Sequence, residues 1–349
     1  MMFASQISST VLLAASAVSA GNVLWDGRFN DYASAADLDK WSFSNPVGEY
    51  QYYIHGKGET AEYVGLSADF KNPADGASKQ GVKISLTDSA FWNGQNMRRT
   101  ELIPQTKAAI NKGKVYYHFS MKRSEANAPV ANREHQIAFF ESHFTEMKAG
   151  SNGDADPALR WFADSKSQWD TAWDADVWHN LAYEIDFDGS TVGLWHSTGA
   201  DALKQVVKPV KASTSSNGAD WHLGMLELPG SGSGDENEDI FFSGVYIESG
   251  DLTTAIGSGS AAGSADAPAA AKPVASSTAI VKPVASSTAV VSSAAPTTLA
   301  TSTKAPTTSV AAQPTQSATS TAAQTTATAT TKPKPKCRKR KARGVKRSA

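Results

Sequence analysis

Residues 91–102, with the sequence FWNGQNMRRTEL, hold the densest run of polar side chains in the chain. If the second half of this run is a β-strand, Arg99 and Glu101 project from one face of it and Arg98 from the other. A guanidinium beside a carboxylate favours the ionised form, which suits a general base. The spacing therefore predicts Glu101 as a catalytic carboxylate. An Arg–Glu pair on a solvated sheet face is the alternative.

The same run carries side chains that could hold a sugar. Trp92 is a flat apolar plate on which a pyranose ring can stack, and amide groups can bond to hydroxyl groups. The substrate-binding residues predicted in this run are Trp92, Asn93, Gln95, Asn96, Arg98 and Arg99.

A second polar segment spans residues 133–144, with the sequence REHQIAFFESHF. Strict alternation places Glu141 on one face with His135 and His143, among apolar residues, and Gln136 on the other face. Burial of this kind disfavours a charged carboxylate and suits a general acid. Glu141 is therefore the predicted acid, although a glutamate at the edge of the core could simply bond to a histidine. His135, Gln136 and His143 are predicted substrate contacts.

A third segment, DWHLGMLE, places His222 on the strand face opposite Trp221. A lone histidine on a strand more often has a structural role, so His222 is a secondary catalytic candidate and Asp164 a weaker one. His135 and His143 would lie roughly 26 Å apart on a straight strand, which is too far to share a metal. We therefore predict no metal site and no cofactor.

The elements that must position these residues are β-strands. Residues 23–249 consist of short alternating segments broken by Gly, Asn, Asp and Pro, without helical periodicity. Strands are expected at residues 82–86, 115–121, 135–144 and 240–247, and a hairpin at residues 181–195 that turns at Asp188 and Gly189. The fold class predicted is all-β, a β-jelly-roll sandwich with a substrate cleft over residues 21–252.

The two ends of the chain have other compositions. Residues 1–20 contain a short apolar stretch and end in Val-Ser-Ala, which predicts a signal peptide and a secreted product. Residues 253–331 are rich in Ser, Thr, Ala and Pro and lack aromatic residues, which indicates a disordered, O-glycosylated stalk. Residues 332–349 form a basic tail that holds the only cysteine, Cys337.

Charge restricts the partners. Residues 1–250 carry a formal net charge of about −12, because basic groups gather near the C-terminus. An acidic folded domain argues against binding to nucleic acid or to a polyanionic substrate. We expect a neutral polymer as the partner of a monomer that does not insert into membranes.

Four segments resemble a known family: TAEYVGLSADFKNPADGASKQGVKISL, FWNGQNMRRTELIP, REHQIAFFESHFTEMK and DWHLGMLELP. They are similar to fungal glycoside hydrolase family 131 across residues 21–248. The resemblance implies a β-jelly-roll, β-glucanase activity on β-1,3, β-1,6 and β-1,4 linkages, and an inverting reaction. It also implies an active site made of Glu101, Glu141 and His222.

Two other functions fit part of the pattern. A jelly-roll polysaccharide lyase also uses an Arg-x-Glu-Leu strand and a Gln/His pair, but the negative domain would repel a uronan. A non-catalytic lectin would bind glucan without cutting it. For a hydrolase, the sequence favours Glu141 as acid and Glu101 as base.

Overall fold

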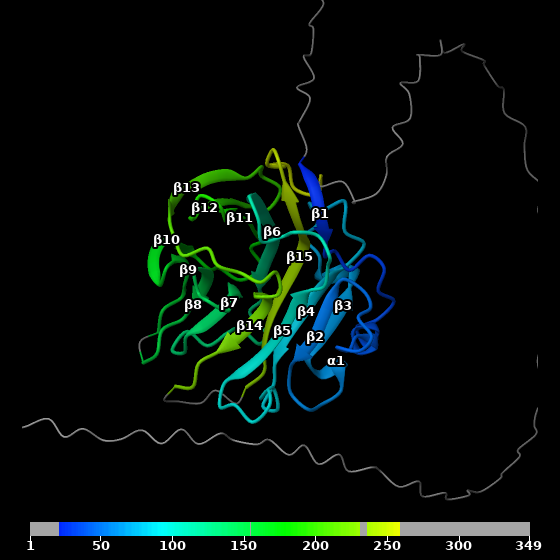
Figure 1. Ribbon diagram of the computed structural model, residues 1–349. Helices are drawn as coiled ribbons and strands as arrows, with labels where there is room; N and C mark the ends of the chain where they lie inside the picture. Colours follow the sequence, from blue (N-terminus) through cyan, green and yellow to red (C-terminus); the bar gives the residue numbers. More distant parts are fainter. Residues whose placement is uncertain (1–20, 154, 231–235, 259–349) are drawn as a thin grey trace, which may run out of the picture. The chain divides into compact units, whose positions relative to one another are not determined.

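The computed structural model describes residues 21–153, 155–230 and 236–258. Within these ranges the protein is almost entirely β-structure, as predicted, and forms two antiparallel sheets packed as a sandwich (Figure 1). The predicted signal peptide, the basic tail and all but the first residues of the predicted stalk lie outside the described residues. None of the helices in the described part is long and apolar enough to span a membrane.

The first sheet has the strand order β13 (Lys204–Lys211), β12 (Thr191–Thr198), β11 (His179–Asp186), β6 (Lys114–Arg123), β15 (Glu238–Ser249), β4 (Gly81–Leu86) and β3 (Val64–Ser67), and β1 (Asn22–Asp26) also pairs with β15. The second sheet has the order β10 (Lys166–Ala172), β9 (Ala158–Ala163), β8 (Thr145–Ala149), β7 (His135–Phe140), β14 (Trp221–Glu227), β5 (Arg98–Pro104) and β2 (Tyr50–Ile54). The helices described are short: α1 (Thr60–Tyr63), η1 (Ala35–Lys40) and η2 (Ala68–Phe70). The predicted hairpin is confirmed as β11 and β12, which pair in register.

Aromatic side chains fill the space between the sheets. Trp221 on β14 lies with its ring centroid 5.2 Å from Tyr117 on β6 and 6.4 Å from Trp25 on β1, edge to face in both cases. These rings are almost fully buried. Burying one side chain of this size stabilises the fold by about 1.5–3 kcal/mol. Because Trp221 points inward, the next residue of β14, His222, points to the outer face of the second sheet.

Strand β7 departs from the predicted alternation. Ala138 has φ of +45°, and the pairing with β14 shifts register beside it. As a result Ile137 and Phe140 both belong to the core, although strict alternation puts them on opposite faces. The strand also ends at Phe140, so the prediction of one strand over residues 135–144 is wrong. Residues 141–144 form a turn before β8.

His135 precedes the irregularity and shares the inner face with Ile137, so it joins a buried ion cluster between the sheets. Its Nε2 lies 2.6 Å from Glu238 Oε2 on β15 and 3.7 Å from Glu227 Oε2 on β14. Arg98 pairs with the same two glutamates, and Arg133 pairs with Glu227 at 2.5 Å. The cluster joins β5, β7 and β14 of one sheet to β15 of the other. Removing one partner from such a buried cluster costs about 3–5 kcal/mol.

The folded unit continues past Leu252, the boundary predicted from composition. The Thr253 hydroxyl and amide donate to the two oxygens of Glu248, at 2.7 and 2.6 Å. The Leu203 amide donates to the Thr254 carbonyl at 2.9 Å. Thr253 is 1% exposed. The first residues assigned to the stalk therefore pack against the first sheet.

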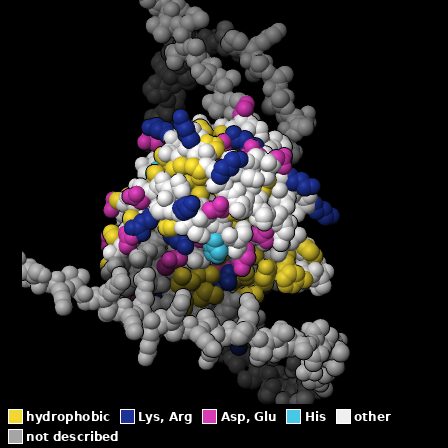
Figure 2. Space-filling view, turned by 60° about the vertical axis from the view of Figure 1, so that its left-hand side comes forward, with side chains coloured by type: hydrophobic (Ala, Val, Ile, Leu, Met, Phe, Trp, Pro, Cys, Tyr) yellow, Lys and Arg dark blue, Asp and Glu magenta, His cyan; other side chains and the backbone are white. Residues whose placement is uncertain are grey.

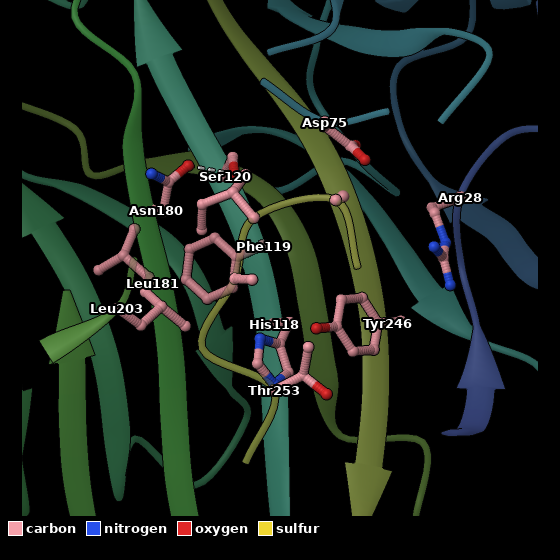
Figure 3. A pocket seen from close by; sticks show the side chains of 14 residues that line it. Arg28, Asp75, His118, Phe119, Ser120, Asn180, Leu181, Leu203, Tyr246 and Thr253 are labelled. Atoms are coloured by element: carbon pink, nitrogen blue, oxygen red, sulfur yellow. Dashed lines mark hydrogen bonds between the residues drawn. The ribbon is translucent and has the colours of Figure 1, made fainter. Parts of the chain in front are cut away.

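This segment helps to line a small cavity on the first sheet (Figure 3). His118 and Tyr246 stack there with ring centroids 4.2 Å apart. The Ser120 hydroxyl donates to Asn180 at 2.7 Å. The volume of about 20 Å³ holds roughly one water molecule, so this hollow is not a sugar site.

We predict that truncation after Leu252 lowers the melting temperature by several degrees, because Glu248 loses both Thr253 donors in the interior. Truncation after Ser258 should leave it unchanged. Calorimetry on both variants measures this, and equal melting temperatures would show that residues 253–258 do not stabilise the domain.

The ion cluster predicts a loss of stability at alkaline pH. Burial opposes protonation of His135, but its hydrogen bonds to Glu227 and Glu238 outweigh burial and raise its pKa to about 9. The unfolded value is about 6.5. The stabilisation is therefore complete below pH 6.5 and is lost as pH rises through 9, by on the order of 3 kcal/mol. Unfolding free energies of the wild type and His135→Gln across this range test it. The unfolding free energy of the variant should change less with pH than that of the wild type. An equal pH dependence would exclude His135 as the source of the alkaline loss of stability.

Candidate active site

The outer face of the second sheet carries the cluster that contains two of the predicted catalytic residues on adjacent strands. Glu101 lies on β5 and His222 on β14, and these strands pair antiparallel. Gly224 is opposite Glu101, and a Cβ atom at this position would lie 2.2 Å from the Thr100 carbonyl oxygen. Glycine thus permits the close approach of the two backbones beside the site.

Glu101 is fully buried, and both of its oxygens accept hydrogen bonds. Arg99 Nε and Nη2 donate to its two oxygens, each at 2.7 Å, in a bidentate pair. His222 Nδ1 lies 2.5 Å from Oε2. A carboxylate paired with Arg99 can only accept, so His222 donates from Nδ1. The prediction that Arg99 and Glu101 share a strand face is confirmed.

Glu141 lies on the other side of the imidazole. Its Oε2 is 3.5 Å from His222 Nε2, and its side chain is 63% exposed, in the turn that follows β7. Phe139 contacts the His222 ring at a centroid distance of 4.9 Å and stacks against His143. The expectation that Glu141 is buried among apolar residues is wrong, because the β7 irregularity and the turn bring it to the surface. Glu101 is the buried carboxylate.

Several predicted substrate-binding residues surround this cluster. The Arg99 guanidinium carbon lies 5.7 Å from the centroid of the Trp92 ring. Gln95 accepts a hydrogen bond from Arg99 Nη1 at 3.2 Å. Asn93 and Asn96 are exposed in the same loop between β4 and β5.

The remaining predicted contacts are engaged elsewhere. Gln136 bonds to Glu134, and His143 bonds to Glu146 at 2.9 Å, which raises the pKa of His143. Arg98 and His135 lie on the inner face in the buried ion cluster, so the structure separates them from Glu101. Asp164 accepts a bond from the Ser213 amide in a turn.

An aromatic ridge borders the site, and Trp92 is the one residue of this ridge that was predicted from the sequence. It consists of Trp41, Phe43, Tyr53 and Trp92, whose successive ring centroids lie 4.7, 5.2 and 6.2 Å apart. Phe43 is 76% exposed. Alternation on β2 indicates part of this ridge, because Tyr50 and Tyr52 point inward and Tyr53 therefore lies on the outer face. Figure 2 shows hydrophobic side chains gathered along the lower edge of one face, with scattered charges elsewhere.

Tyr53 connects the ridge to the carboxylates. Burial raises its pKa, and the charges of Glu101 and Glu141 raise it further. The phenol is therefore protonated at neutral pH and can donate a hydrogen bond to an oxygen that enters the site.

Among the described residues, the cluster whose geometry could hold a metal ion lies outside this site. The donor atoms of His135, Glu227 and Glu238 lie within 4.8 Å of one another among the described residues. Arg98 and Arg133 already bind these carboxylates, however, and neutralise their charge. The fit to a cation is therefore poor.

Two glutamates on either side of an imidazole, with an aromatic ridge beside them, are compatible with acid–base cleavage of a polysaccharide. Residues 23–253 match the model of the glycoside hydrolase 131 catalytic N-terminal domain. No curated protein matches the chain.

Two solved structures are similar over the same region. The β-glucanase catalytic domain of this family from Podospora anserina has 65% sequence identity and a TM-score of 0.67, over 68% of this chain and all of that one. The catalytic domain of a family 131 protein from Coprinopsis cinerea has 47% identity and a TM-score of 0.65, over 69% of this chain and all of that one. The chain therefore belongs to glycoside hydrolase family 131, and residues 23–253 are its catalytic domain.

Proposed function

We propose that this glycoside hydrolase is a secreted β-glucanase that cleaves β-1,3-, β-1,6- and β-1,4-glucosidic bonds by acid–base catalysis dependent on Glu101 and Glu141, with inversion. The observation that carries the proposal is the placement of His222 between the two carboxyl groups, 2.5 Å from Glu101 and 3.5 Å from Glu141. The similar Podospora anserina domain, described as a β-glucanase, supports the substrate class.

The surroundings of the site favour a neutral sugar polymer. The ridge of Trp41, Phe43, Tyr53 and Trp92 offers flat apolar faces next to the carboxyl groups, and pyranose rings stack on such faces. The net charge of about −12 over residues 1–250 would repel a uronan. These features favour a glucan over the substrate of a lyase.

The separation of the carboxyl groups supports inversion. Retaining glycosidases hold theirs about 5–5.5 Å apart, whereas inverting ones leave roughly 6.5–9.5 Å. Here one imidazole stands between the two groups, with contacts of 2.5 Å to Glu101 and 3.5 Å to Glu141. An imidazole between the carboxyl groups favours the wider, inverting arrangement.

Incubation of the purified protein with laminarin, pustulan, cereal mixed-linkage glucan and a uronan tests the function. Chromatography should detect saturated glucose oligomers from the glucans, and polarimetry should show the inverted anomer first. An ultraviolet-absorbing product from the uronan would indicate a lyase, and glucan binding without cleavage a lectin.

We predict that Trp92→Ala and Phe43→Ala each raise KM for soluble glucan by about 2- to 10-fold, with a smaller loss of kcat, because each removes a stacking surface. Val206→Ala is the matched control, since Val206 is an exposed apolar residue on β13 in the other sheet. Steady-state kinetics measures the effect. Kinetics equal to the control would place these rings outside the glucan path.

We also predict that Glu141→Gln lowers kcat by about 10²–10⁴-fold, because the amide keeps the shape but carries no transferable proton. Adding Glu101→Gln should reduce the rate by far less than the product of the single losses, since both serve one step. Circular dichroism verifies the fold. A near-normal kcat for Glu141→Gln would assign Glu141 a structural role.

A further inference from the structure

We infer that His222 is the catalytic base of this site and that Glu101 is a positioning residue that acts through it. The inference rests on the proposed glycosidase function and assigns the role of each group in it. It replaces the prediction that Glu101 itself activates the water.

Glu101 cannot readily contact a water or a sugar. Its side chain has no exposed surface. Both of its oxygens accept from Arg99, and Oε2 also accepts from His222. A reacting water finds no exposed oxygen of Glu101, and the charge-assisted bonds to Arg99 and His222 already occupy three of its roughly four acceptor positions.

The contact with Glu101 instead prepares His222. The donated Nδ1–H fixes the tautomer and the ring plane, so the lone pair of Nε2 points toward Glu141 and the exposed side of the site. Arg99 balances the Glu101 charge, so Glu101 orients the imidazole without an uncompensated negative charge beside it. A carboxylate has the same relation to the histidine in hydrolases with a Ser-His-Asp triad.

Hydrolysis can then be written with all protons balanced. Glu141, in its acid form, gives its proton to the glycosidic oxygen as the bond to the anomeric carbon breaks. A water attacks that carbon and gives a proton to His222 Nε2. The imidazolium then returns this proton to the Glu141 carboxylate across the 3.5 Å contact, which restores both groups. One water is consumed for each bond cut.

Substrate must enter between Nε2 and Glu141 for this to happen. The Glu141 side chain is 63% exposed and makes no tight hydrogen bond to His222, so it can rotate outward. The contact seen in the free protein is the geometry in which the proton is returned.

The charged and titratable groups around His222 and its two glutamate partners come from four parts of the chain. They are Arg99 and Glu101 on β5, Tyr53 on β2, Glu141 and His143 after β7, and Asp220 before β14. All must be considered when a pH profile is interpreted.

The direct test is the tautomer of His222 in the full chain labelled with ¹⁵N-histidine. The His222 signals are identified by their loss in His222→Gln. We expect Nδ1 protonated and Nε2 unprotonated at neutral pH, in the absence of substrate. A protonated Nε2 with a bare Nδ1 would overturn the inference, whether or not any glucan is cleaved.

The kinetic test uses pH profiles of kcat/KM on an active glucan. His222→Gln should lower kcat by about 10²–10⁴-fold. Glu101→Gln should also lower kcat, because the amide no longer fixes the tautomer and ring plane of His222. Imidazole in the buffer should restore part of the rate to His222→Ala.

His196→Gln is the matched control, because His196 lies on β12 in the other sheet and bonds to His179. It should leave the rate and both limbs unchanged. If His222→Gln keeps the acidic limb and most of kcat while Glu101→Gln loses both, then Glu101 is the direct base. A wild type that cleaves no glucan would instead refute the proposed function, and the tautomer measurement would still decide this inference.

Discussion

The bidentate pair of Arg99 with Glu101 is the interaction on which the site depends. A buried ion pair is tolerable only when its remaining lone pairs are satisfied, and loss of one partner leaves an uncompensated charge at a cost of about 3–5 kcal/mol. Here His222 completes the hydrogen bonding of Glu101 from the neighbouring strand. The bond from His222 requires a fixed register between β5 and β14, and Gly224 allows the close contact that this register needs.

Strand β5 serves two ion networks from its two faces. Arg98 points inward and ties the second sheet to Glu238 of the first, whereas Arg99 points outward and holds Glu101. Because adjacent residues of a strand alternate, two neighbouring arginines can stabilise the sandwich and organise its reactive face at once. The inner network holds β5, β7 and β14 in place, and these strands carry the outer cluster or lead into it. A disturbance of the inner network would therefore reach the site through the backbone.

Alternation alone was sufficient to predict the fold class, the shared face of Arg99 and Glu101, and the position of His222 opposite Trp221, because β5 and β14 pair with each other without a register shift. It failed on β7, where Ala138 adopts a positive φ that its residue type does not announce. That one residue reverses the faces before and after it, so His135 was assigned to the wrong network and Glu141 to the wrong environment. The composition also placed the domain end at Leu252, because the bonds of Thr253 to Glu248 join residues that the sequence gives no reason to pair.

The central claim is that Glu101 reaches the substrate only through His222, and a crystal structure of Glu141→Gln with a bound β-glucan oligosaccharide tests it most directly. The account predicts a water within about 2.6–3.2 Å of His222 Nε2 and on the face of the anomeric carbon opposite the leaving oxygen. Residue 141 should lie beside that oxygen, and Glu101 should keep its bonds to Arg99 and His222. A structure in which Glu101 has released His222 and holds the water itself would contradict the account.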